Sequence, residues 1–257
     1  MTKSNLKTVA YFIFFISFVS NLTAETFITE NELELAVINV GEPLGYIDGQ
    51  GNNAGIYYKI TEQFAKATGM KVIIKLLPFQ RMIGELIRGK IDCAIFFTST
   101  ERQKTFTQVG LVIKKPVIIA LRPLNLGESK FNMDNLAYFE GKTLGLVRGA
   151  QYSDAIEKNT KIIKWPVNSY KNGLRMLAKG RIDGFVGGKE TIDEHYTVNN
   201  YDYYVLQMNT SWLQCSKQSP RMTPEILTKV TNAYTSISKN QITKIIRKYI
   251  PTYQPIE

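Results

Sequence analysis

Leu86-Ile-Arg-Gly-Lys-Ile-Asp92 and Leu177-Ala-Lys-Gly-Arg-Ile-Asp183 are nearly the same sequence, and this recurrence decides the predicted fold. Each copy follows an amphipathic segment and precedes a short apolar one, which predicts a helix, a glycine stop and a buried strand. Gly89 and Gly180 stand where a helix ends in the left-handed conformation, which glycine adopts without a Cβ clash. One such joint is ordinary in an α/β protein. Two predict a pair of similar α/β lobes, and clefts between lobes bind small molecules.

The residues around the first copy predict the order strand, helix, strand, helix, strand. We expect the strands at 33–40, 71–77 and 92–97 and the helices at 55–69 and 78–88. This order implies a parallel sheet with ligand chemistry at the carboxyl ends of its strands. A polar loop or short helix at 98–106 and a strand at 116–121 then lead out of the first lobe.

The residues around the second copy predict a similar lobe. We expect strands at 141–147, 161–165 and 183–186, helices at 169–179 and 189–195, and a segment at 148–153 that turns into a helix. Strands at 203–208 and 212–216 return the chain to the first lobe, which helices at 220–238 and 241–249 complete. We therefore assign residues 25–121 and 211–257 to the first lobe and 122–210 to the second.

Residues 1–24 have the pattern of a cleavable secretory signal. Lys3 and Lys7 precede an apolar core at 9–19, and Ala24 offers a small residue at the cleavage site. The alternative is a membrane anchor, but the apolar core is far shorter than the roughly 20 residues that a spanning helix needs. We therefore expect a protein that is exported to the periplasm.

The formal net charge is +10 at pH 7, and the basic residues are spread along the sequence without a Lys/Arg run. We therefore expect no nucleic-acid partner, and instead a basic surface with a positive cleft that attracts anions. Cys93 and Cys215 allow one disulfide in an exported protein, and two separate buried thiols are the alternative. Because His195 is the one histidine and no ligand cluster surrounds it, we expect no metal and no cofactor.

Several motifs occur in an order that resembles a known family. Gly55-Ile-Tyr57 opens a helix, Thr98-Ser-Thr-Glu-Arg102 follows the first joint, and Phe139-Glu-Gly-Lys-Thr-Leu-Gly-Leu-Val-Arg-Gly149 precedes the second. The ordered set resembles the extracellular solute-binding proteins of family 3, the periplasmic receptors of polar amino-acid ABC importers. The resemblance implies a two-lobed periplasmic-binding-protein fold of type II, with two mixed sheets flanked by helices and a hinged cleft between the lobes.

Two positions depart from the pattern of amino-acid binders in this family. Their Thr-x-Thr-x-x-Arg motif, whose arginine clamps the ligand carboxylate, is one residue shorter here and ends at Arg102. The acid that holds the ligand ammonium falls on Gly188, and Glu190 is the nearest acid. The resemblance therefore implies a small polar solute, an amino acid or a related carboxylate.

Two arginines are candidates for binding a carboxylate, because a guanidinium donates two parallel hydrogen bonds. Arg102 follows the third strand, and Arg81 lies in the first turn of the helix that starts at Pro78. Each could instead be an ordinary surface arginine. Thr98 and Ser99 offer hydroxyl and amide groups at the same strand end, or they could cap the segment that follows.

The remaining candidates come from the loops and from the second lobe. Gly149, Ala150, Gln151 and Tyr152 begin a predicted helix, so their amides could bind an anion, or they could form a plain βα turn. Further candidates are Tyr46 and Tyr57 as cleft walls or packing residues, and Glu190 as a polar contact. Asp92 and Asp183 resemble a catalytic pair, but each starts a strand, away from the cleft, so we interpret both as structural.

We predict from these features a non-enzymatic, monomeric periplasmic receptor that presents its solute to the membrane permease of an ABC importer. One alternative is a ligand sensor that docks on a membrane signalling receptor. Another is a dehydratase-like enzyme on the same fold, which would need a positioned acid or base.

Overall fold

The computed structural model describes residues 32–122, 135–196 and 201–255, so the predicted signal at 1–24 lies outside the described residues. Among those residues, no helix has both the length and the apolar character that crossing a bilayer requires. The helices are α1 (Ile56–Thr68), α2 (Phe79–Ile87), α3 (Thr100–Thr105), η1 (Leu136–Phe139), α4 (Asp154–Glu157), α5 (Tyr170–Ala178), α6 (Lys189–His195), α7 (Pro224–Ser236) and α8 (Lys239–Tyr249). The strands are β1 (Glu32–Ile38), β2 (Tyr46–Ile47), β3 (Asn53–Ala54), β4 (Lys71–Leu77), β5 (Cys93–Phe97), β6 (Phe106–Leu121), β7 (Thr143–Val147), β8 (Ile163–Val167), β9 (Gly184–Gly188) and β10 (Tyr203–Ser216).

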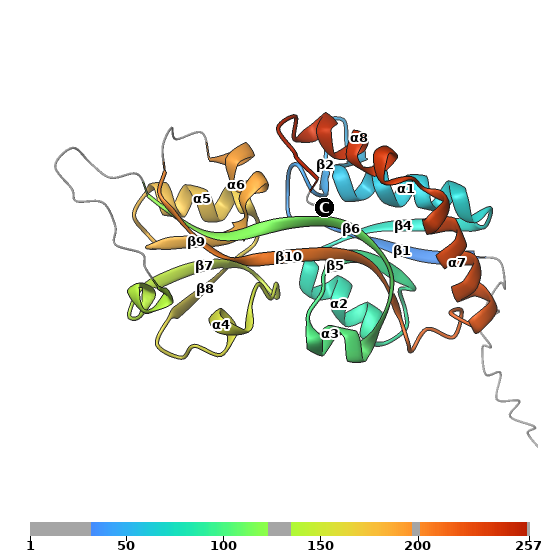
Figure 1. Ribbon diagram of the computed structural model, residues 1–257, viewed down its shortest axis with the longest axis horizontal. Helices are drawn as coiled ribbons and strands as arrows, with labels where there is room; N and C mark the ends of the chain where they lie inside the picture. The colour runs from blue at the N-terminus through green and yellow to red at the C-terminus, as the bar shows by residue number, and fades with distance from the viewer. Residues whose placement is uncertain (1–31, 123–134, 197–200, 256–257) are drawn as a thin grey trace, which may run out of the picture.

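These elements form two α/β halves, which confirms the predicted fold class. Figure 1 shows α1, α2, α3, α7 and α8 around β4, β1 and β5 in one half, here called the first half. It shows α4, α5 and α6 around β8, β7 and β9 in the other, here called the second half. In both halves helices lie above and below the sheet. The inner strands β1, β5, β7 and β9 are mostly buried, whereas the edge strand β8 is mostly exposed.

The two halves share one pair of long antiparallel strands, β6 and β10, which pair with each other from one end to the other. In the first half β5 adds to β10, and in the second half β9 adds to β6. The two expected sheets are therefore joined into one eight-stranded sheet, in the order β4-β1-β5-β10-β6-β9-β7-β8. Because β6 and β10 belong to both halves, the residue limits assigned to the two lobes stay predictions.

The lengths of β6 and β10 were not predicted. The sequence indicated a strand only from Pro116 and two separate strands near the C-terminus, whereas β6 begins at Phe106 and β10 is continuous. Register shifts at three places let polar residues enter the ladder without ending it. A regular strand alternates inward-facing and outward-facing side chains, and each register shift interrupts this alternation. The strands are therefore hard to recognise from the sequence pattern alone.

The repeated joint has the same hydrogen bonds in both copies. Gly89 and Gly180 have φ values of 67° and 64° and end α2 and α5 as predicted. The backbone N–H of Asp92 donates to the carbonyl of Glu34 on β1, and the N–H of Glu34 donates back to the Asp92 carboxylate at 2.6 Å. Asp183 makes the equivalent pair of bonds with Thr143 on β7. Each aspartate therefore fixes the register of its strand against the first strand of its half.

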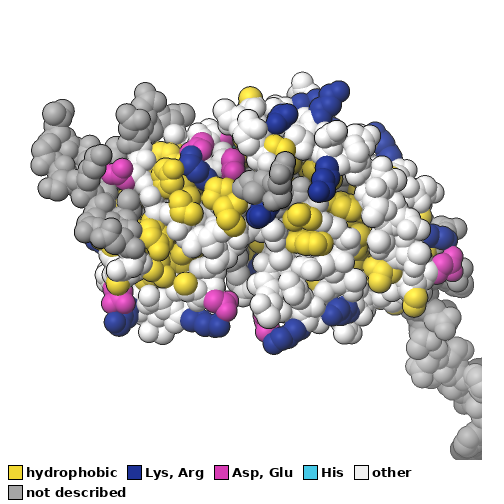
Figure 2. Space-filling view, in the orientation of Figure 1, with side chains coloured by type: hydrophobic (Ala, Val, Ile, Leu, Met, Phe, Trp, Pro, Cys, Tyr) yellow, Lys and Arg dark blue, Asp and Glu magenta, His cyan; other side chains and the backbone are white. Residues whose placement is uncertain are grey.

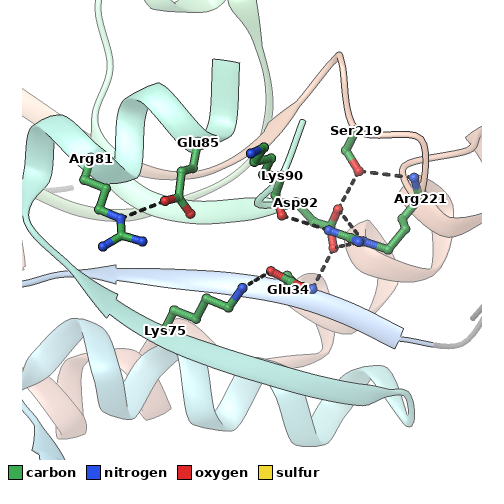
Figure 3. A network of polar contacts seen from close by, with 8 residues as sticks. All are labelled: Glu34, Lys75, Arg81, Glu85, Lys90, Asp92, Ser219 and Arg221. Carbon is green, nitrogen blue, oxygen red and sulfur yellow. Dashed lines mark hydrogen bonds and ion pairs between the residues drawn. The ribbon is translucent and has the colours of Figure 1, made fainter. Parts of the chain in front are cut away.

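Burial distinguishes the two aspartates. Asp92 is fully buried, and Arg221 donates to both of its carboxylate oxygens at 2.9 and 3.0 Å, which anchors the segment before α7 (Figure 3). Ser219 also donates to this carboxylate. Asp183 is exposed to solvent. The bonds of both aspartates agree with a structural role, but only Asp92 also binds an arginine, which attaches the segment before α7 to its half.

Cys93 and Cys215 are joined by a disulfide between the paired strands β5 and β10. The bridge covalently attaches the returning strand to the first half. Of the two alternatives left open by the sequence, the structure has the bridge rather than separate thiols.

The basic residues are dispersed over the surface. Figure 2 shows Lys and Arg side chains at separate places around the visible face, with acidic side chains beside several of them. Many of the ion pairs join residues one helical turn apart, such as Lys158 with Asp154 and Lys229 with Glu225. Exposed pairs of this kind contribute little to stability.

We predict that Asp92→Ala lowers the free energy of unfolding by about 3–5 kcal/mol, because it leaves the Arg221 guanidinium without its buried partner. Asp183→Ala serves as the matched control and should cost about 1–2 kcal/mol, the value of an exposed charge-assisted bond. Urea unfolding followed by circular dichroism measures both changes. Equal losses for the two variants would show that the Asp92 network contributes no more than its surface counterpart.

Candidate ligand site between the two halves

A narrow inner cavity of about 40 Å³ lies between the two halves. The first half contributes residues near the carboxyl ends of β1 and β5 and from the nearby helices: Ile38, Val40, Leu44, Tyr57, Phe79, Ile95, Phe96, Phe97 and Arg102. The second half contributes Val147, Ala150, Gln151, Tyr152 and Tyr170. Most of the wall is apolar or aromatic. This is the strand edge at which the sequence predicted ligand chemistry.

A wider outer groove of about 720 Å³ adjoins the inner cavity, and Val40, Phe79 and Val147 line both. Its other lining residues are more polar: Asn39, Gly41, Pro78, Gln80, Arg81, Arg148, Asn168 and Ser169. The inner cavity and the outer groove therefore share part of their wall, to which both halves contribute.

Arg102 is the charged residue of the inner cavity. Its side chain is 7% exposed, and its Nη1 donates to the Phe97 carbonyl at 2.6 Å. The guanidinium carbon lies 5.2 Å and 5.5 Å from the ring centres of Phe79 and Phe96. Burial lowers the pKa of Arg102 to about 10, so the group stays charged at neutral pH. The guanidinium is thus held in place with N–H donors left for a ligand.

Thr98 and Ser99 are occupied with local bonds. Ser99 is the N-cap of α3 and accepts a hydrogen bond from the Arg102 backbone N–H, while the Thr98 hydroxyl accepts one from Gln108. Neither lines the inner cavity or the outer groove. Ser99 is therefore a helix cap, as the alternative interpretation stated. By capping α3, it helps to position Arg102, which lies in the first turn of that helix.

The segment from Gly149 to Tyr152 faces the first half, but it is not helical. The helix begins later, at Asp154, and Ser153 caps it. The amides of Ala150 and Tyr152 already donate within the segment, to Val147 and to Glu157. The prediction that this segment begins a helix was therefore wrong, because a serine five residues after Arg148 offers the better cap. Ala150, Gln151 and Tyr152 contribute to the cavity wall instead.

Three buried tyrosines wall the inner cavity. The Tyr57 hydroxyl shares a hydrogen bond with Ser211 of β10 at 2.9 Å, and the Tyr170 hydroxyl accepts one from the Gly188 amide at 3.1 Å. Burial raises the pKa of Tyr57, Tyr152 and Tyr170, so all three are neutral phenols at physiological pH. They can offer hydrogen bonds to a solute without adding charge.

Lys115 lies directly behind this wall and was not predicted. It is fully buried on β6, its ammonium donates to Thr191 at 3.3 Å, and it lies 5.6 Å from the centre of the Phe97 ring. Burial lowers the pKa of Lys115, and the charge of Glu190 opposes this shift. Two neighbouring lysines, Lys114 and Lys115, precede the apolar run from Pro116, and the sequence alone does not show which of them is buried.

The other candidates lie outside the inner cavity. Glu190 is on the first turn of α6 near Lys115, and its Oε2 is buried without a hydrogen-bond partner. Arg81 lines the outer groove and donates to Glu85 at 2.8 Å. Tyr46 lies on β2 and lines neither space. The structure thus brings together Tyr57, Arg102 and the segment 150–152, and leaves Tyr46, Thr98 and Ser99 apart.

The two halves are in close contact across the cleft. Gly149 has a φ of 76°, and a Cβ atom on it would lie 3.0 Å from Cβ of Gln80 in the first half. On the other side, the His195 ring at the end of α6 contacts the carbonyl of Glu42. The structure is therefore a closed form.

Comparison with known proteins agrees with this architecture. The model of the bacterial extracellular solute-binding proteins, family 3, matches residues 33–252. The probable amino-acid-binding protein YxeM of Bacillus subtilis is 24% identical over 197 residues, which are 75% of this chain and 72% of YxeM. A membrane-bound lytic murein transglycosylase F of Nitrosospira multiformis is 25% identical over 168 residues, but the match spans only 34% of that protein.

Solved structures share the fold at low sequence identity. A mutant of ArgBP from T. maritima has a TM-score of 0.72 and 18% identity, covering 86% of this chain and 96% of its own. The periplasmic VFT2 domain of BvgS from Bordetella pertussis has a TM-score of 0.67 and 17% identity, covering 86% and 94%. These matches confirm the two-lobed periplasmic-binding-protein fold of type II.

We predict that Gly149→Ala favours a more open form, because the new methyl group meets Gln80 across the cleft. Gly180→Ala is the matched control: it has a similar φ of 64° but nothing within 4 Å of its Cβ position. Both variants should lose about 1 kcal/mol of stability from the left-handed backbone. Only Gly149→Ala should increase the radius of gyration in small-angle X-ray scattering. An unchanged radius would mean that the contact does not hold the halves together.

Proposed function

The chain belongs to the bacterial extracellular solute-binding proteins, family 3, and we propose that it is a periplasmic receptor for one small polar solute, an amino acid or a related carboxylate. The receptor captures its solute between the two halves and delivers it to the membrane permease of an ABC importer. The relatives are mostly named as binding proteins, and we propose no catalytic activity. The name of YxeM, a probable amino-acid-binding protein, supports this solute class.

The observation that carries the proposal is the buried Arg102 in the inner cavity. The Arg102 guanidinium is removed from water and is held by the Phe97 carbonyl and by the rings of Phe79 and Phe96. Its remaining N–H donors need an anionic partner. A carboxylate provides two acceptors in the plane of the guanidinium. The walls from Ala150 to Tyr152 complete the site from the second half. A solute bound to Arg102 thus contacts both halves only when they are closed.

Such contacts make closure dependent on the solute, because a ligand stabilises the state in which it has more interactions. The strands β6 and β10 are the connections along which the two halves can bend. A hinged closure around a ligand is a common motion of two-lobed proteins. The closed form then differs in shape from the open one, which is the difference that a permease can detect.

A sensory role is the second candidate. The VFT2 domain of BvgS has the same fold over 94% of its length, and this likeness supports a receptor that docks on a membrane signalling protein. Both candidates need the same solute-dependent closure. Binding of the solute-loaded form to membranes that contain the permease, and not to those without it, would favour transport.

We predict that Arg102→Gln weakens solute binding by about 2–4 kcal/mol, roughly 30- to 1000-fold, because a buried charge partner is lost. Arg81→Gln should weaken it less than tenfold, since Arg81 is largely exposed and already bonded to Glu85. Arg88→Gln, outside the cleft at the end of α2, is the control and should bind normally.

The measurement is calorimetry with the solute that gives the largest rise in melting temperature from a panel of amino acids and organic acids. A tight ligand raises the apparent stability of the protein that binds it. If Arg102→Gln binds as well as the unmodified chain, Arg102 is not the carboxylate ligand. If no solute in the panel stabilises the protein, the proposed solute class is wrong.

A further inference from the structure

The charged residues that line the cleft all have the same sign. Arg102 lines the inner cavity, and Arg81 and Arg148 line the outer groove. Within the described part of the chain, no acidic residue lines either space. Arg81 is offset in part by Glu85, but Arg102 has no ion pair within 4 Å among the described residues. A solute that enters this cleft therefore meets positive charge along its whole path.

A fourth basic residue, Lys115, lies fully buried immediately behind the cavity wall. Gly188 makes room for it: a Cβ atom on that glycine would lie 2.7 Å from Cε and 2.9 Å from Nζ of Lys115. The Gly188 amide in turn donates to Tyr170, which lines the cavity. The end of the Lys115 side chain thus occupies the space that a side chain at position 188 would need.

The two nearest acids are not placed to receive an ammonium group from a solute. Glu190 does not line the cavity, and its charge already favours the protonated form of Lys115. Glu157 is half-buried on the second half, where its carboxylate accepts the Tyr152 amide, and its charge favours the protonated form of Arg102. Neither carboxylate lines the inner cavity, although Oε2 of Glu190 is buried without a hydrogen-bond partner, so the cavity wall itself offers an ammonium ion no anionic group.

We propose that this receptor, if it is one as argued above, selects an anionic solute with an apolar body and without an ammonium group, such as a simple carboxylic acid rather than an α-amino acid. A carboxylate is stabilised by Arg102, the buried guanidinium on the cavity wall. A desolvated ammonium in the same cavity meets no anionic group on the wall and is repelled by Arg102. The apolar and aromatic walls suit a hydrocarbon body.

The test uses matched compounds that differ in one charged group. 3-Phenylpropionate, L-phenylalanine and 2-phenylethylamine share a body and carry, respectively, the carboxylate, both groups and the ammonium alone. 4-Methylpentanoate and L-leucine form an aliphatic pair. Calorimetry at pH 7 with the purified protein should show each plain carboxylate binding at least tenfold more tightly than its amino acid, and no binding of the amine.

Lys115→Met tests the contribution of the buried ammonium, because methionine keeps the hydrocarbon stem and removes the charge. The preference for the plain carboxylate over the amino acid should fall by about tenfold. Lys114→Met, at the half-buried neighbouring position on β6, is the matched control and should leave that preference unchanged. The comparison on the unmodified chain decides the proposal even if Lys115→Met fails to fold.

The possible outcomes separate this inference from the proposed function. Tighter binding of L-phenylalanine or L-leucine would overturn the inference and leave the receptor function standing. If Glu190→Gln then removed that preference, Glu190 would be identified as the ammonium partner. Binding of no compound in either series, together with failure of the wider panel of solutes, would overturn both the inference and the proposed solute class.

Discussion

The antiparallel ladder between β6 and β10 is the constraint on which the rest of the structure depends. These two strands pair with each other along their whole length and supply an inner strand to the sheet of each half. The disulfide fixes β10 to β5 at one end of this ladder. The position of the cleft follows, because it lies between the two halves that this strand pair joins.

The same ladder places polar groups behind the cleft. Lys115 of β6 and Ser211 of β10 lie on the shared strands, where they contact residues from both halves. Lys115 is bonded to Thr191 of the second half, and Ser211 to Tyr57 of the first. The shared strands therefore hold buried polar groups that contact each half.

The local sequence predicted a large part of the fold and a smaller part of the site. The β4 strand and α6 have the limits that were predicted, and the helix predicted at 169–179 begins with Ser169 as the N-cap of α5. Of the site residues, Arg102 and Tyr57 were predicted and line the inner cavity. Lys115 was missed because nothing in a single strand shows which of two neighbouring lysines points inward. Tyr46 was a candidate because it lies in a loop and Thr98 because it follows a strand, and neither position shows where a side chain points.

The sequence by itself determined the two α/β halves, because the helix stop, the apolar strand and the aspartate of each joint depend on bonds within a few residues or on the first strand of the same half. Only the tertiary structure decided how the halves are connected and what charge the cleft carries. Those properties depend on pairs such as Lys115 with Gly188 and Cys93 with Cys215, which are far apart in the chain. Their effect comes from burial, because a charge in contact with water is screened and the same charge behind an aromatic wall is not.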